Sequence, residues 1–420
     1  MSLSESAPSA EAPSFAALAR GVSTLTAAEA VRVAVSAALA IYLARTLGAS
    51  AFGQWTFALA VAGYPLALVE AGLTWIGTRD VAAHPESAAS LVRRIVPLRL
   101  ALAVAGALVV VVCAFTLTGP GTGRVVVIFA GASLLTMALT IDWVFYGLER
   151  RSIVAAANVL RVAVFAAAAF AIVRHESQVW AVPLLQAAGE TAAAVLLWIA
   201  FVSSVPTDRP GAPVVGTRDL MAQAAPLTLA QFMRALTLWS AVTILGLRTT
   251  AAEVGQFGAA QRLTLLAGGF STLYFYGYVP LASRAAQNGA AAIADLVRRS
   301  VRLTALATLP FAIAATVFAD PIVRIVFGAA FAGAAPVLRI VVWTIPISVL
   351  GGHFRHTLIS LKQTRVDAAA VAAGAIVTVA CNLALTSRFG LAGGAVSMVA
   401  GETVLTAAAI ALVARRVEFR

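Results

Sequence analysis

The sequence predicts an all-α polytopic membrane protein with about twelve transmembrane helices, arranged as two parallel six-helix repeats. Three observations support this: the composition, the series of long apolar stretches and an internal repeat. Of the 420 residues, 61% are hydrophobic and 11% are charged, and the mean hydropathy is +0.92. Soluble domains are nearer 45–50% apolar and about 25% charged. A single soluble core could not bury so much apolar chain, so the protein is expected to lie in a membrane.

Apolar stretches long enough to cross a bilayer, which takes about 20 residues, follow one another along the chain. The first six are 23–46, 52–78, 94–117, 124–147, 153–173 and 178–203. The next six are 219–246, 253–281, 299–318, 335–360, 366–386 and 391–413. These spans predict a tail at 1–22, an N-lobe at 23–205, a linker at 206–218, a C-lobe at 219–414 and a tail at 415–420.

An internal repeat relates the two sets of six spans. Ala188–Thr191 (Ala-Gly-Glu-Thr) recurs as Ala400–Thr403, at an offset of 400 − 188 = 212 residues. At nearly the same offset, Gly53-Gln54-Trp55 parallels Gly255-Gln256-Phe257, and Val92-Arg93-Arg94 parallels Val297-Arg298-Arg299. A fixed period indicates a duplicated architecture. Because six is an even number, both halves enter the membrane in the same sense, which makes this a parallel repeat.

The basic residues in the loops predict the orientation. Loops on one side hold Arg20, Arg79, Arg93, Arg94, Arg150, Arg151, Arg209, Arg218, Arg284, Arg298, Arg299, Lys362, Arg365, Arg415, Arg416 and Arg420. Loops on the other side hold Arg45, Arg124, Arg174, Arg248, Arg324 and Arg388. The richer side is expected to be cytoplasmic. Both termini are therefore predicted to lie in the cytoplasm.

The loops leave no room for a catalytic domain. The longest outer piece, at about 319–334, has the pattern of a short interfacial helix that begins near a proline.

Cys113 and Cys381 lie in separate spans and predict neither a disulfide nor a metal site. The scattered arginines do not suggest nucleic acid. No enzyme activity, cofactor or metal is expected.

Five arginines lie well inside predicted spans. At about 2.5–3.5 kcal/mol each, five that faced lipid would cost on the order of 12–18 kcal/mol. They should therefore face protein, water or a substrate. They are Arg32, Arg161, Arg234, Arg262 and Arg355.

Arg262 and Arg234 are the leading candidates for a cavity site. Gln261 is next to Arg262, and Gln231 precedes Arg234 by one turn. Amides suit sugar hydroxyls, and arginine binds phosphate bidentately while it stays charged. Arg32 and Arg161 are further candidates. The alternative for each is a structural ion pair, for Arg32 with Glu29 three residues earlier.

Acidic residues also lie inside the spans. Glu70, Glu190 and Glu402 are candidate coupling or helix-packing residues. A glycine precedes each of the latter two, which permits close helix approach. The remaining polar groups are expected at the membrane interface: Asp142 with Trp143 as an anchor, and His353, Arg355 and His356 by snorkelling.

Several motifs in order resemble the polysaccharide flippases of the multidrug/oligosaccharidyl-lipid/polysaccharide exporter superfamily. In the first half these are Leu43–Gly48, Phe52–Trp55 and Glu70–Leu73; in the second half they are Gly255–Phe257, Ala260–Arg262, Pro280, Asp320-Pro321 through Gly328, and Phe389–Ala395. The similarity covers nearly the whole chain.

The resemblance implies two lobes flanking a cavity that opens alternately to each side of the membrane. It also implies export of an undecaprenyl-pyrophosphate-linked oligosaccharide, with membrane lipids and a polysaccharide polymerase or export machinery as partners. Cavity arginines of such proteins are thought to engage the pyrophosphate. By position within the matching motifs, that role passes to Arg262 and then to Arg32.

Two alternatives remain open. A multidrug or cation antiporter of the same superfamily would favour an acidic cavity, whereas the surplus here is basic. A membrane glycosyltransferase or polysaccharide polymerase would need acidic catalytic residues in a large outer loop.

Overall fold

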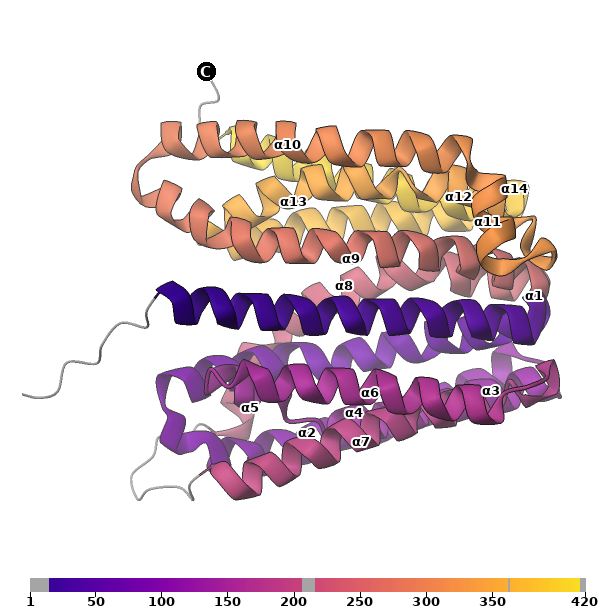
Figure 1. Ribbon diagram of the computed structural model, residues 1–420, viewed down its shortest axis with the longest axis horizontal. Coiled ribbons are helices and arrows are strands. Elements are labelled where there is room, and N and C mark those ends of the chain that lie inside the picture. The colour runs from indigo at the N-terminus through magenta and orange to yellow at the C-terminus, as the bar shows by residue number, and fades with distance from the viewer. Residues whose placement is uncertain (1–14, 206–215, 362, 416–420) are drawn as a thin grey trace, which may run out of the picture.

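The computed structural model describes residues 15–205, 216–361 and 363–415. All regular secondary structure within these ranges is helical (Figure 1). The first half comprises α1 (Phe15–Ala83), η1 (Pro85–Ser87), α2 (Ala88–Leu117), α3 (Thr122–Ala130), α4 (Ala132–Ala138), α5 (Asp142–Gly147), α6 (Arg151–Ile172), η2 (Glu176–Gln178) and α7 (Ala181–Ser204). The second half comprises α8 (Thr217–Arg248), α9 (Ala251–Gln287), α10 (Ala290–Val317), α11 (Ala319–Phe327), η3 (Ala329–Phe331), α12 (Ala334–Val341), α13 (Thr344–Ser360) and α14 (Thr364–Ala414).

Two glycines divide the longest helices. Gly48 in α1 has φ 68° and Gly390 in α14 has φ 53°, a left-handed backbone conformation that glycine adopts without a Cβ clash. Each of these helices therefore runs across the molecule, turns and runs back. Both turns fall between predicted spans, at 46–52 and 386–391.

The predicted fold class is confirmed. In the described chain, nine segments are long and apolar enough to cross a membrane, and two of them are the divided helices α1 and α14. The 37-residue α9 is long enough to add another crossing. Counted this way, the described helices match the twelve predicted spans. The short helix expected at 319–334 is present as α11 and η3. The predicted tails and the linker lie largely outside the described residues.

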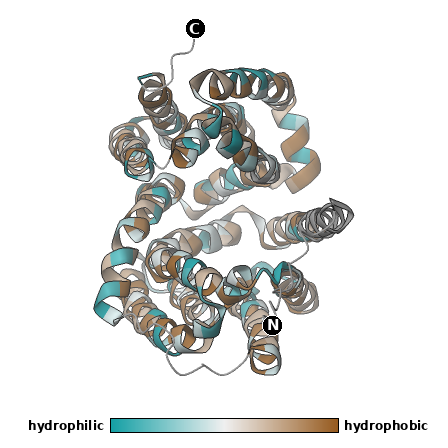
Figure 2. Ribbon diagram, turned by 90° about the vertical axis from the view of Figure 1, so that its left-hand side faces the viewer, coloured by the Kyte–Doolittle hydropathy of each residue, from teal (hydrophilic) through white to brown (hydrophobic). Residues whose placement is uncertain are grey.

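The two halves form two groups of helices, one below and one above in Figure 1. Figure 2 shows the same groups with the helices viewed from one end. The beginning of α1 and the end of α14 lie at the same end of the molecule, on the left of Figure 1; this end is called the terminal end below. The turns at Gly48 and Gly390 lie at the opposite end, which is called the kink end. Successive spans alternate in direction between the two ends.

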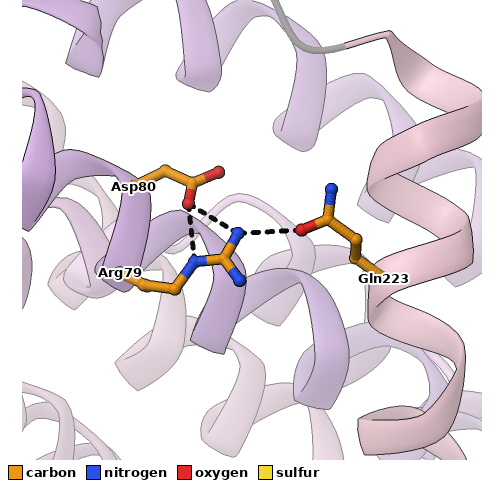
Figure 3. A network of polar contacts seen from close by, with 3 residues as sticks. All are labelled: Arg79, Asp80 and Gln223. Atoms are coloured by element: carbon orange, nitrogen blue, oxygen red, sulfur yellow. Dashed lines mark hydrogen bonds and ion pairs between the residues drawn. The ribbon is translucent and has the colours of Figure 1, made fainter.

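Helix α8 crosses from one half to the other. Near its start, Leu220 and Ala224 are buried in the core of the first half with Leu73. Further along, the amide of Asn382 in α14 donates to Ser240 Oγ at 3.0 Å. The start of α8 is also joined to the end of α1, because Arg79 donates to Gln223 Oε1 at 2.9 Å while it is held by Asp80 (Figure 3).

At the kink end, the halves touch through two glycines that the sequence repeat relates to each other. A Cβ on Gly53 of α1 would overlap the carbonyl oxygen of Ala251, and a Cβ on Gly255 of α9 would overlap that of Ala49. The two backbones therefore cross in direct contact, which only residues without side chains allow. Arg45 adds a second link, because its guanidinium donates to the carbonyls of Ile325 and Val326 at the end of α11.

The crossing predicts different outcomes for two glycines of α9. Gly255→Ala should destabilise the protein by about 1–3 kcal/mol, because the added methyl group has no space. Gly268→Ala should be neutral or stabilising by up to about 1 kcal/mol, because no described atom lies within 4 Å of its Cβ position. Thermal unfolding of the detergent-solubilised variants measures both. Equal stability of the two variants would contradict the close crossing.

Candidate functional site

Arg262 lies where the two halves meet. It is 11 residues after the start of α9 (262 − 251), roughly 16 Å from the kink end and thus near the middle of a bilayer. Its guanidinium carbon lies 4.0 Å from the ring centre of Trp55 and 5.2 Å from that of Phe52. Both rings belong to α1, so an arginine of one half is covered by aromatic side chains of the other.

Within the described residues, no carboxylate forms an ion pair or a hydrogen bond with Arg262. A buried charge without an opposite charge is costly in a membrane. Cation–π contacts contribute about 2 kcal/mol or more of stabilising free energy when they are desolvated. Arg262 therefore retains most of its capacity to bind an anion.

The expectation that Gln261 faces a cavity is wrong for this structure. Its side chain is 2% exposed, and its amide donates to the carbonyl of Leu238 in α8 at 2.8 Å. Neighbouring residues on a helix point in different directions, about 100° apart. Arg262 therefore faces α1 while Gln261 faces α8, where it joins the two helices.

Arg234 and Gln231 lie on an exposed face of α8. Both residues are exposed, as is Leu227 one turn earlier. The Arg234 guanidinium nevertheless interacts electrostatically with Arg355, Glu402 and Asp367. Arg234 is therefore accessible and lies near charges from other helices of its own half.

The bond between Gln261 and Leu238 sets the relative heights of the two arginines. It places these two residues opposite each other on antiparallel helices. Arg262 is one residue from Gln261, and Arg234 is one turn before Leu238, an axial step of about 6 Å. The backbones at Arg262 and Arg234 therefore lie within about one helical turn of each other along the helix axes.

The prediction that Arg355 and His353 snorkel to the interface is wrong. Arg355 makes a bidentate ion pair with Asp367 of α14, with Nε–Oδ1 at 2.7 Å and Nη2–Oδ2 at 2.9 Å. His353 is fully buried: its Nδ1 donates to the carbonyl of Val349 at 2.8 Å, and its Nε2 accepts from the Tyr274 hydroxyl at 3.0 Å. The positions of His353 and Arg355 along α13 did not by themselves reveal these partners. Asp367 could have been suspected because it lies inside the predicted span 366–386.

The first half holds a separate cluster of charges. Glu70 interacts electrostatically with charged residues from four other segments: Arg99, Asp142, Arg161 and Glu190. Glu190 is 5% exposed and accepts hydrogen bonds from Thr136 Oγ1 at 2.6 Å and from Gln186 Nε2 at 3.2 Å. Arg161 thus lies in a mixed cluster within its own half rather than beside Arg262.

Asp142 and Trp143 are not an interfacial anchor as predicted. Trp143 is fully buried and packs against Gly77 of α1. Asp142 lies in the charge cluster, and its Oδ1 accepts from the Trp143 backbone amide at 3.0 Å.

Arg99 is a structural residue that the sequence analysis did not single out, although it lies inside the predicted span 94–117. It is 1% exposed, and it donates to the carbonyls of Thr140 at 2.6 Å and Met137 at 2.8 Å. These carbonyls lie at the break between α4 and α5. Backbone groups released by a break inside a membrane need another partner, and Arg99 supplies it.

The two glycines of the repeated Ala-Gly-Glu-Thr motif are both points of close helix approach. A Cβ on Gly189 of α7 would overlap the Arg161 carbonyl of α6, and one on Gly401 would overlap Thr378 in the preceding span of α14. Glu190 and Glu402 therefore follow equivalent contacts in the two halves. Glu402 differs in its surroundings, because Arg234 and Arg355 lie close by.

Arg32 lies in the first part of α1 and is partly buried. It is 16 residues before Gly48 (48 − 32), roughly 24 Å from the kink end, so it lies closer to the terminal end than Arg262 does. The side chain of Glu29, its alternative partner, falls outside the described residues.

An apolar pocket of about 280 Å³ lies between α4 and α7. It is lined by Thr136, Leu139, Thr191, Ala194, Val195, Trp198 and Ile199. Val195 and Ile199 are exposed, so the pocket opens to the lipid-facing side. Among the described residues, no cluster of His, Cys, Asp and Glu is placed to hold a metal ion.

The fold and its paired halves define the class: a multi-pass membrane protein with the fold of the MOP-superfamily transporters. The lipid II flippase MurJ in an inward closed conformation is similar, with a TM-score of 0.74 and 11% identity over 93% of this chain and 87% of MurJ. An inward-facing multidrug resistance MATE family transporter gives a TM-score of 0.71 and 13% identity over 92% of this chain and 94% of that one. A Pyrococcus furiosus transporter of this superfamily, described as having a binding pocket of reverse polarity, gives 0.63 and 14% identity over 95% of both chains.

The chain belongs to the polysaccharide biosynthesis protein family, whose profile matches residues 18–286. Among curated proteins, it is similar to a probable low-salt glycan biosynthesis flippase, Agl15, of Haloferax volcanii, with 28% identity over 160 residues. That match covers 38% of this chain and spans about a third (34%) of the relative.

The Arg355–Asp367 ion pair predicts that a single and a double substitution at these positions differ in their effect on the free energy of unfolding. Arg355→Ala alone should destabilise the protein by about 3–5 kcal/mol, because it leaves the Asp367 carboxylate without its partner. The double variant Arg355→Met/Asp367→Leu should recover most of that loss. Unfolding in detergent measures both variants, and a double variant less stable than Arg355→Ala would contradict the assignment of this pair as structural.

Proposed function

We propose that this protein flips an undecaprenyl-pyrophosphate-linked oligosaccharide across the bacterial inner membrane for surface polysaccharide biosynthesis. The observation that carries the proposal is a pair of arginines, Arg262 and Arg234, near mid-membrane in a chain of the polysaccharide biosynthesis protein family. The polyprenyl chain would remain in lipid while the headgroup passes between the two halves. No covalent chemistry is part of this function.

The chemistry of the pair suits a diphosphate. Guanidinium groups donate in a planar fork to phosphate oxygens and stay charged in a low-dielectric site. Each of them can donate to a phosphate oxygen of a diphosphate headgroup. Gln231, exposed on the same face of α8, is available for sugar hydroxyls.

The contacts between the halves support alternating access with loading from the terminal end. The backbones of α1 and α9 cross in contact at the kink end. Toward the terminal end of α9, Gly268, Gly269 and Gly277 have no described atom within 4 Å of their Cβ positions. The terminal end also carries most of the loop arginines, which supports a cytoplasmic location for this end and for both chain termini.

A multidrug or cation antiporter is the second candidate, favoured by the likeness of the fold to MATE family transporters. An organic cation needs unpaired acidic groups. In the second half, Asp367 is already paired with Arg355, and Glu402 has both Arg234 and Arg355 near it. The accessible charge at the meeting of the halves is basic, which favours an anionic headgroup.

The proposal predicts that Arg262→Gln and Arg234→Gln each reduce surface polysaccharide in cells that depend on this gene. One charged hydrogen-bonding group contributes about 1.5–3 kcal/mol, which corresponds to a loss of affinity for pyrophosphate of about tenfold to a hundredfold. Gel analysis of the polysaccharide and recovery of the lipid-linked precursor from the inner leaflet measure the effect.

The matched control is Arg248→Gln, because Arg248 is exposed on the same helix at the kink end. It should leave the polysaccharide at its normal level. Normal polysaccharide in both Arg262→Gln and Arg234→Gln, at normal amounts of protein, would remove the pair from the mechanism.

A further inference from the structure

We propose that Trp55 and Phe52 act as a gate for the kink end: they hold Arg262 while that end is closed and release it when an anionic headgroup binds. In the closed state the aromatic rings thus contact the same guanidinium group that would bind the substrate. Trp55 is a positioning residue in this scheme, acting through Arg262. The anion's identity as a diphosphate rests on the proposed function.

The first support is the geometry of the rings. Phe52 and Trp55 are 0% and 2% exposed, and they meet edge to face with centroids 5.6 Å apart. Phe331 of η3 meets Phe52 edge to face at 5.7 Å. Arg262 therefore sits against a rigid aromatic cluster that contains side chains of both halves. The indole Nε1 of Trp55 is itself buried, with no hydrogen-bond partner among the described residues.

The second support is the position of this contact beside the crossing. Gly258 lies one turn before Arg262 in α9, and a Cβ there would lie 2.6 Å from Thr56 Cγ2, next to Trp55 in α1. The crossing of Gly53 with Gly255 is one further turn toward the kink end. Separating α1 from α9 at the kink end must therefore separate Arg262 from Trp55.

The third support is the balance of interactions. Arg262 has no carboxylate partner among the described residues, so ring contacts are what offset its charge in this conformation. A phosphate oxygen binds a guanidinium more strongly than a ring face does. An anion that replaces the ring contacts of Arg262 with a phosphate contact therefore destabilises the closed state relative to the open state. A ligand shifts a conformational equilibrium only through such a difference in its interactions with the two states.

The test measures access to the crossing. Cys113 and Cys381 are replaced by alanine, and Thr56→Cys, at a position 3% exposed, reports opening through its rate of maleimide labelling in purified protein. Trp55→Leu should raise the rate about tenfold or more, because the cation–π contact is lost. Trp55→Phe, which keeps an aromatic ring, should give a smaller rise and serves if the leucine variant does not fold.

The matched control is Phe57→Leu. Phe57 is 7% exposed and packs across the halves against Gly246, whereas the described aromatic rings that Arg262 contacts are those of Phe52 and Trp55. A purely structural role for Trp55 predicts similar increases in Trp55→Leu and Phe57→Leu, and that result would overturn the gate. An unchanged rate in Trp55→Leu would overturn it as well.

Inorganic pyrophosphate tests the link to an anion. It should raise the labelling rate of the parent protein and leave that of Arg262→Gln unchanged. Adding Arg262→Gln to Trp55→Leu should give less than the combined effect of the two single substitutions, because both remove the contact between Arg262 and Trp55. No response of the parent to pyrophosphate would overturn the coupling. If the parent responds while Arg262→Gln cells make normal polysaccharide, the proposed function fails and the gate stands.

Discussion

A guanidinium inside a membrane must find a partner other than water, and this requirement organises the interior of the protein. Arg99 uses backbone carbonyls released by a break between helices. Arg355 uses a carboxylate in a bidentate pair. Arg262 uses the faces of Trp55 and Phe52. The first two arrangements fix structure, because removing either partner leaves a buried polar group unpaired. The third is weaker and can be exchanged for an anion, which is why we propose a functional role for Arg262.

Gene duplication gives this arrangement its geometry. Gly53 and Gly255 are equivalent in the sequence repeat, and each lies against the backbone beside the other. Two helices related by a pseudo-twofold axis along the membrane normal can meet at that axis, and a residue near it meets its own equivalent. Glycine permits that meeting at the shortest distance. The charged residues do not follow the repeat: position 60, a turn beyond Thr56 in α1, is an alanine, whereas Arg262 lies a turn beyond Gly258 in α9.

The two ends of the molecule are held together in different ways. At the kink end, backbone contact and the bonds from Arg45 to α11 join the halves. At the terminal end, α8 forms the bridge, with its first turns buried in the first half and with Gln223 bonded to Arg79. The surface-exposed bond at Arg79 is worth little energy, about 0–1 kcal/mol. The conformation described is therefore one in which the kink end is the more firmly closed.

The sequence alone determined the membrane class, the twelve crossings and the duplication, because hydrophobicity and a fixed period are properties of the chain itself. It also located the arginines that need partners, since an ionised group inside a span is costly wherever the span packs. Only the tertiary structure decided which partner each arginine has. Arg355 pairs with Asp367 instead of reaching the interface, and Gln261 turns into a helix contact while its neighbour Arg262 meets Trp55. These outcomes depend on the rotation of each helix and on contacts between residues far apart in the chain. A membrane span is apolar both where it faces lipid and where it faces protein, so its sequence pattern does not show which side contacts a neighbouring helix.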